Sequence, residues 1–145
     1  MTRIEQLCHV LGWRPSAADV DVAAIESALG LPLPLDYQDF LATTDGFEGI
    51  IGEVYLVLLG PTELVAANAR ASIAEFHPAH VLIGGNGAGE WFLIDTNTGQ
   101  YVMVPGIGRA LDAIPQGPTL ESFLDRTFKD QWFERTMPDK RRENR

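Results

Sequence analysis

Two pairs of nearby residues in this 145-residue chain have side chains that could bind a metal ion or act in catalysis. His77 and His80 could share a metal ion, but Pro78 lies between them and no cysteine is close in sequence to complete a zinc site. Cys8 and His9 could form a thiol–base pair, yet neighbours on a helix point about 100° apart, and Cys8 belongs to an apolar stripe. We therefore predict no metal ligand, and we expect Cys8 to be buried and slow to react with thiol reagents.

A glycine cluster, GGNGAG, spans residues 84–89 and invites a phosphate-binding interpretation. Gly84 and Gly89 have the spacing of P-loop glycines, but Glu90 and Trp91 stand where that loop needs Lys and Ser or Thr. The next segment is predicted to be a strand, so no helix N-terminus would face a phosphate, and a dinucleotide-binding fingerprint fails for the same reason. The cluster is instead typical of a hairpin turn that needs positive φ.

Carboxylates are plentiful, with 20 Asp and Glu residues, but none has an obvious acid–base partner. Asp36 and Asp39 are three residues apart, and if Tyr37 and Phe40 face the core, the two acids share the opposite, solvated side of a helix. Without a nucleophile–base pair, we predict no catalytic and no cofactor-binding residue, and hence a protein that is not an enzyme and needs no cofactor.

The charge is unevenly distributed along the chain. Residues 1–125 carry 16 acidic and 4 basic side chains, a net charge of −12, whereas residues 126–145 carry 7 basic and 4 acidic ones, a net charge of +3. An acidic body argues against nucleic acid or an anionic membrane as a direct partner. Solubility alone accounts for the acidity equally well.

The single cysteine excludes an intramolecular disulfide and favours a reducing compartment. The N-terminal sequence lacks the unbroken apolar stretch of a signal peptide. The longest apolar run, residues 54–59, is much shorter than the roughly 20 residues that span a bilayer. We expect a cytoplasmic protein.

The elements that must position these residues begin with three helices, each marked by apolar residues at helical spacing. The first helix spans residues 4–11, with Cys8 and Leu11 on its apolar stripe and Gly12 at its end. The second starts near Asp19 or Asp21 and stops at Gly30. The third begins at Pro34, and its inward-facing residues are Tyr37, Phe40 and Leu41.

A strand is predicted at residues 53–58 and a helix at 62–76, followed by strands at 80–83, 90–95 and 100–104 that tight turns join into an antiparallel meander. A closing helix has Thr119 as its cap, apolar positions from Leu120 to Trp132, and Pro138 at its end. This order predicts the α+β class: N-terminal helices, a central antiparallel sheet, and a C-terminal helix packed on it. We expect one domain at residues 1–137 and a flexible basic tail at 138–145.

The segment from residue 22 to 46, VAAIESALGLPLPLDYQDFLATTDG, resembles the opening motif of the SUKH superfamily of Smi/Knr-type domains. The matching positions are Ile25, Glu26, Leu29, Gly30, Leu33, Pro34, Asp36, Tyr37, Phe40, Leu41 and Gly46. Asp45 replaces the usual Asn, and both residues tolerate turn geometry. The segments VLIGGNGAGEWFLID and LESFL resemble the family's glycine turn and late helix more loosely, with Leu120 in place of an aromatic residue.

The resemblance implies a SUKH-like fold and a role as a bacterial immunity protein, which binds a cognate toxin, often a nuclease, and blocks it. Many toxin nucleases are basic because they bind phosphates, and an acidic chain would complement such a partner. Some fungal relatives are regulatory scaffolds, so a regulatory module without a toxin partner is an alternative. A small-ligand binder at the loop between Gly84 and Gly89 is another.

Loops and strand edges can present carboxylates to a basic partner without disturbing the core. On this ground we predict a partner-binding surface with Asp45, Glu48, Glu53 and Glu90, and with Trp91 as an aromatic anchor. Strand alternation leaves either Trp91 or Phe92 facing inward, so the tryptophan is equally compatible with the core.

Overall fold

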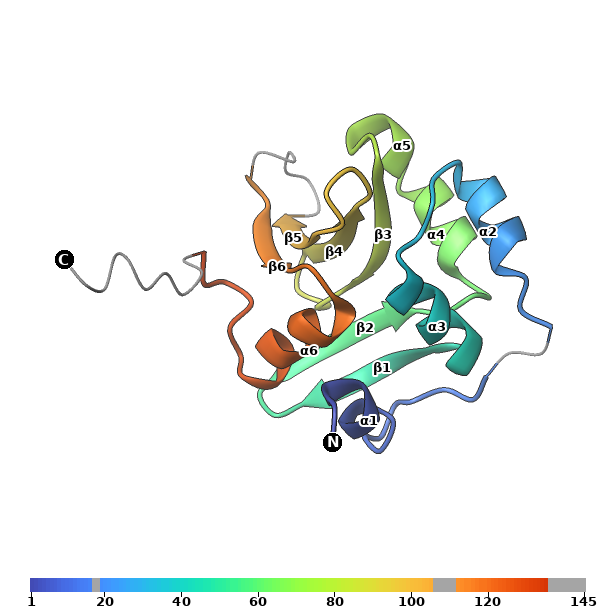
Figure 1. Ribbon diagram of the computed structural model, residues 1–145. Coiled ribbons are helices and arrows are strands. Elements are labelled where there is room, and N and C mark those ends of the chain that lie inside the picture. Colours follow the sequence, from blue (N-terminus) through green and yellow to red (C-terminus); the bar gives the residue numbers. More distant parts are fainter. Residues whose placement is uncertain (17–18, 106–111, 136–145) are drawn as a thin grey trace.

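The computed structural model describes residues 1–16, 19–105 and 112–135, and its strands form one antiparallel sheet in sequence order, β1 to β6 (Figure 1). The elements are α1 (Arg3–Leu7), α2 (Val22–Leu29), α3 (Leu35–Thr43), β1 (Gly46–Ile51), β2 (Val54–Leu59), α4 (Leu64–Arg70), α5 (Ile73–Phe76), β3 (His80–Gly85), β4 (Glu90–Asp95), β5 (Tyr101–Pro105), β6 (Ile114–Gly117) and α6 (Leu120–Phe128). This is the predicted α+β class. None of the helices in the described residues is long and apolar enough to cross a membrane.

Local signals in the sequence set the ends of α2. The Asp21 carboxylate accepts a hydrogen bond from the backbone N–H of Ala24 (3.1 Å), and Gly30 ends the helix in the left-handed region with φ 75°. An aspartate cap and a C-terminal glycine are common at these positions because they satisfy orphan backbone groups and permit positive φ. The predicted bounds of this helix are confirmed.

The closing helix begins as predicted but ends earlier. Thr119 and Ser122 form a reciprocal capping box at its start. The helix stops at Phe128, and Trp132 lies beyond it, buried, with its Nε1 donating to the Thr127 hydroxyl (2.8 Å). The predicted end at Pro138 and the tail at 138–145 lie outside the described residues.

Two acidic positions of the N-terminal motif serve as internal acceptors. Glu26 accepts the backbone N–H of Leu33 (2.7 Å) and so fixes the extended link between α2 and α3. Asp36 was expected on a solvated face, and that expectation is wrong. It is half-buried, and it accepts hydrogen bonds from the Tyr101 hydroxyl (2.8 Å) and from the backbone N–H of Leu120 (2.6 Å).

The sheet has two strands that the sequence did not predict. β1 pairs with β2 along its whole length, from Gly46 opposite Leu59 to Ile51 opposite Val54. Its sequence, GFEGII, has two glycines, which are depleted in strands. β6 reads IPQG, and proline is confined to edge strands or bulges, which is where this one lies.

The predicted helix at 62–76 is broken into α4 and α5. The break is at Ser72, whose φ is 53°, outside the range of a right-handed helix. Four residues before it, the Asn68 side chain donates to Leu82 O (2.9 Å) and accepts from Leu82 N (2.7 Å). These are the two backbone hydrogen bonds that a residue of a neighbouring strand would make with Leu82. The amide therefore holds α4 against β3.

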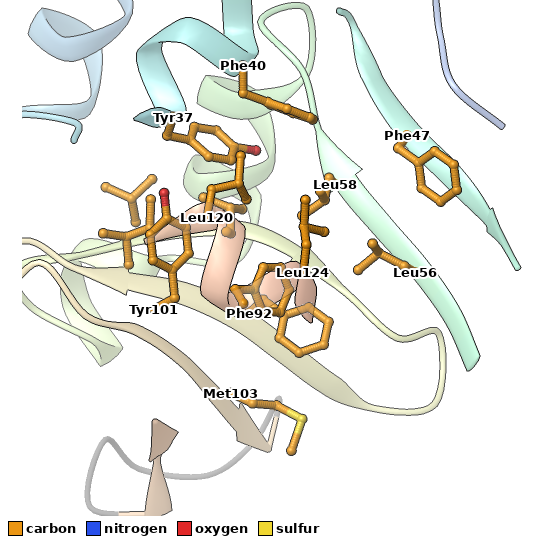
Figure 2. Close-up of a cluster of buried hydrophobic side chains, with 14 of the residues drawn as sticks. Tyr37, Phe40, Phe47, Leu56, Leu58, Phe92, Tyr101, Met103, Leu120 and Leu124 are labelled. Carbon is orange, nitrogen blue, oxygen red and sulfur yellow. The ribbon is translucent and has the colours of Figure 1, made fainter. Parts of the chain in front are cut away.

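The main core lies against one face of the sheet, where side chains of α3 and α6 meet those of the strands (Figure 2). A smaller cluster on the opposite face joins Leu82, Leu93, Val102 and Val104 to Ala67 of α4 and Ile73 of α5. Strands β3 to β5 are therefore covered on both faces.

The expectation that Cys8 is buried on an apolar stripe is wrong. α1 ends at Leu7, and Cys8 is its cap residue, only half-buried, with the thiol donating to Glu5 O (2.9 Å). Leu11, the last residue of the predicted stripe, is exposed. The chain leaves the helix one turn too early for either side chain to reach the core.

Candidate protein-binding surface

The first hairpin, formed by β1 and β2, buries one face and leaves the other open. Its outward side chains are Glu48, Ile50, Tyr55 and Val57. Ile50 lies directly opposite Tyr55, and its side chain is 65% exposed. Facing residues on paired strands have Cβ atoms about 4.5–5.5 Å apart, so these two side chains form one exposed apolar patch.

A cross-strand row connects two of the predicted binding residues on this same outer face. Glu48 lies opposite Val57, Val57 opposite Gly85, and Gly85 opposite Trp91. With strands about 4.8 Å apart, Glu48 and Trp91 are about 14 Å apart along the row. Phe92 faces the main core, and Trp91 is half-buried on the opposite face, where it packs beside the smaller cluster.

Glu48 is part of a polar network rather than a free carboxylate. Arg14 donates to it (2.7 Å) and also reaches Glu63 (3.5 Å), and the Tyr55 hydroxyl donates to it as well. That last hydrogen bond is the main cause that raises the pKa of the exposed Tyr55 hydroxyl.

Glu53 and Glu90 lie near the tips of two hairpins at one end of the sheet. Glu53 is exposed in the turn between β1 and β2. Glu90 begins β4 and accepts a hydrogen bond from the Asn86 side chain (2.9 Å) across the β3–β4 loop. Asn86 lines the same hollow as Glu53.

Asp45 lies at the opposite end of the first hairpin. It is half-buried, and its carboxylate accepts the backbone N–H of Thr62 (3.1 Å), tying the start of β1 to the link between β2 and α4. The structure thus places Glu48 and Trp91 on one face and Glu53 and Glu90 near one end, and it separates Asp45 from both pairs.

Residues that sequence reasoning missed complete this surface. Ile50 would follow from strand alternation if β1 had been recognised, because it has the parity of Glu48. Arg14 comes to Glu48 because residues 12–14 run along the edge of β1: Gly12 O accepts from Glu48 N (3.0 Å), and Arg14 N donates to Gly46 O (3.0 Å). Nothing in the sequence alone signals this contact.

The glycine cluster forms the predicted hairpin turn. Gly87 and Gly89 have φ of 73° and 110°, and the Asn86 side chain accepts the backbone N–H groups of Ala88 (2.9 Å) and Glu90 (3.2 Å). A Cβ at Gly84 would lie 1.8 Å from Val57 O, so this glycine permits the close pairing of β2 and β3. Each of these observations accounts for the cluster by turn geometry or strand pairing.

The two histidines adjoin each other with ring centroids 6.3 Å apart. The His80 Nδ1 lies 2.8 Å from Pro78 O and its Nε2 lies 3.9 Å from Asp95. Within the described residues, no group of three or more His, Cys, Asp or Glu side chains could hold a metal ion. His77 is only 1% exposed, and its Nδ1 has no hydrogen-bond partner among the described residues.

This burial makes His77 a source of acid sensitivity. Burial first, and then the neighbouring His80, lower the pKa of His77, so the fold favours the neutral ring. A group whose folded pKa is depressed in this way stabilises the fold above its unfolded pKa of about 6.5 and loses that contribution as the pH falls. We expect the free energy of unfolding to decline between pH 7.5 and 5.5 by at most about 1.4 kcal/mol per pH unit from this group.

Urea denaturation across that pH range measures how steeply the free energy of unfolding changes with pH. His77→Leu should flatten this dependence, whereas His9→Gln, at an exposed position, should leave it unchanged. Equal slopes in the wild type and His77→Leu would show that the buried ring is not the source.

The α+β fold by itself does not define a function. The sequence model of the SMI1/KNR4 family (SUKH-1) matches residues 16–126. The chain therefore belongs to the SMI1/KNR4 family, as its N-terminal motif indicated. This family is in general one of non-enzymatic binding domains of the immunity-protein type. None of the curated proteins matches the chain.

Proposed function

We propose that this chain is an immunity protein that binds a cognate bacterial toxin through the outer face of its first hairpin and blocks it. The observation that carries the proposal is the exposed apolar patch of Ile50 and Tyr55, which lies beside the Glu48 carboxylate. The chain is acidic and belongs to a family of the immunity-protein type. An apolar centre with a charged rim is the usual anatomy of a protein interface. In this role the chain acts in the cytoplasm of the cell that makes the toxin.

The charge supports a basic partner. The net charge of −9 gives long-range attraction for a cationic domain, such as a nuclease whose active face must bind phosphates. The outer face holds one cation, Arg14, among its described residues, and that cation already pairs with Glu48 and Glu63. Together these three groups carry a net charge of −1, which still favours a basic partner.

Substitution of Ile50 by lysine tests the face. The change places a charge in the apolar patch that the partner would bury. We expect the affinity for the partner to fall about 30-fold or more, which corresponds to a loss of about 2 kcal/mol at the centre of an interface. Leu35→Lys is the matched control, because Leu35 is similarly exposed on α3. Both variants should fold with unchanged circular dichroism.

The experiment has two stages. The immobilised chain first captures partners from cells that encode it, and the captured protein is then expressed with and without the chain in a susceptible host. The proposal requires that the partner is toxic alone, that the wild type and Leu35→Lys protect, and that Ile50→Lys does not. A captured partner that is harmless on its own would favour the regulatory module instead, and equal protection by both variants would move the interface to another face.

A further inference from the structure

A hollow of about 240 Å³ lies where the β1–β2 turn, the β3–β4 loop and the segment after α6 come together. Glu53 and Tyr55 line it from the first hairpin, Asn86 from the second, and Asp130 and Phe133 from the segment after α6. In Figure 1 the tip of the first hairpin lies beside the chain that leaves α6. One water needs about 10–15 Å³ by this measure, so the hollow has room for a side chain.

The lining combines aromatic rings with carboxylates. Phe133 is 61% exposed, so its ring is accessible to a partner at the hollow. Glu53 and Asp130 are exposed, and neither forms an ion pair with any described residue. Lys129, next to Asp130 in sequence, instead pairs with Asp125 (3.0 Å).

Asp130 occupies a backbone position that favours glycine. Its N–H donates to Thr127 O (3.1 Å), the N–H of Gln131 donates to Arg126 O (2.8 Å), and its φ is 56°, so α6 ends in a Schellman motif with Asp130 at the left-handed position. A negative charge is also unfavourable there, because the C-terminal end of a helix carries partial negative charge. Glycine would therefore be more favourable than aspartate at this position, and the Asp130 side chain lines the hollow.

We propose that this groove, defined by Glu53, Tyr55, Asn86, Asp130 and Phe133, receives an arginine side chain of a basic protein partner. A guanidinium is planar, stacks on aromatic rings and donates to carboxylates, and the lining of this groove has both kinds of group. The inference rests on the proposed function for the identity of the partner, but its test does not need that partner.

The probe is N-acetyl-arginine amide, titrated into the ¹⁵N-labelled full-length chain. We expect saturable chemical-shift changes, with a millimolar Kd, at the backbone amides of Glu53, Tyr55, Asn86, Asp130 and Phe133. N-acetyl-citrulline amide has the same shape without the charge and should cause no saturable change. N-acetyl-lysine amide should bind more weakly, because an ammonium lacks the planar fork.

Asp130→Gly is the decisive variant. It should raise the melting temperature, since glycine suits the left-handed position, and it should raise the Kd for N-acetyl-arginine amide about tenfold or more, because one carboxylate is lost. A loss of binding in a more stable protein cannot be attributed to misfolding. Glu53→Gln should weaken binding similarly, and Glu75→Gln, at an exposed position on α5, should not.

Shift changes that stay linear, that occur equally with citrulline, or that persist unchanged in Asp130→Gly would overturn the proposal. The result is separable from the toxin question. If the groove binds arginine but the captured partner is harmless, the immunity function fails and the groove stands. If the chain neutralises a toxin but the groove does not bind N-acetyl-arginine amide, the proposed arginine site is wrong and the immunity function stands.

Discussion

Replacing Phe40 by alanine is expected to lower the free energy of unfolding by about 3–5 kcal/mol. The ring is 3% exposed, and its centroid lies 5.1 Å from that of Tyr37 and 6.0 Å from that of Trp13. Figure 2 shows Phe40 and Tyr37 side by side on α3. Truncation removes both ring contacts and leaves a cavity where α3 meets the start of β1, and the cost of a cavity grows with the volume that the neighbours cannot refill.

Urea denaturation followed by circular dichroism measures this loss as a lower midpoint at constant slope. Leu35→Ala is the control on the same helix, because that side chain is 77% exposed and its removal should change stability by no more than about 0.5 kcal/mol. Pro34→Ala should also cost little, since a helix start tolerates other residues. If Phe40→Ala were as mild as these two, the inward face of α3 would be misassigned.

The parts of the fold that the sequence predicted well are those that short-range signals determine. A capping aspartate and a terminal glycine bound α2, a threonine caps α6, and the short apolar run between Glu90 and Asp95 gives the bounds of β4. β1 and β6 were missed because glycines interrupt the first and a proline interrupts the second, and these residues are depleted in strands. The break at Ser72 likewise has no signal in the local sequence, and nearby Asn68 bonds to a strand residue 14 positions away.

The candidate surface was less predictable because its parts depend on register. Loop carboxylates look alike in sequence, yet Asp45 bonds to the backbone, Glu48 pairs with an arginine 34 residues away, and Glu53 is unpaired among the described residues. The groove with Asp130 and Phe133 needs the end of α6 to reach the tip of the first hairpin. No spacing rule places two such distant segments together.

Replacing Asp36 by alanine is expected to cost about 3–6 kcal/mol, because hydrogen bonds to a charged group each contribute about 1.5–3 kcal/mol and this carboxylate accepts two. Its oxygens bond to the Tyr101 hydroxyl and to the first N–H of α6, at Leu120, and so join α3 to β5 and α6. Tyr101 is almost fully buried, and burial together with the Asp36 charge raises the pKa of its hydroxyl. Without the carboxylate, that hydroxyl is left without this acceptor.

A double-mutant cycle separates this bond from the general loss of an acid. Tyr101→Phe removes the hydroxyl, so it should cost stability in the wild type and cost less in Asp36→Ala, where the partner is already gone. Asp39→Ala is the matched control: it lies on the same helix, is exposed, and should change stability by no more than about 0.5 kcal/mol. Equal effects of Asp36→Ala and Asp39→Ala would mean that the acid of the family motif does not join these elements. A cost confined to Asp36, coupled to Tyr101, would give that motif position a physical role in holding the C-terminal helix on the sheet.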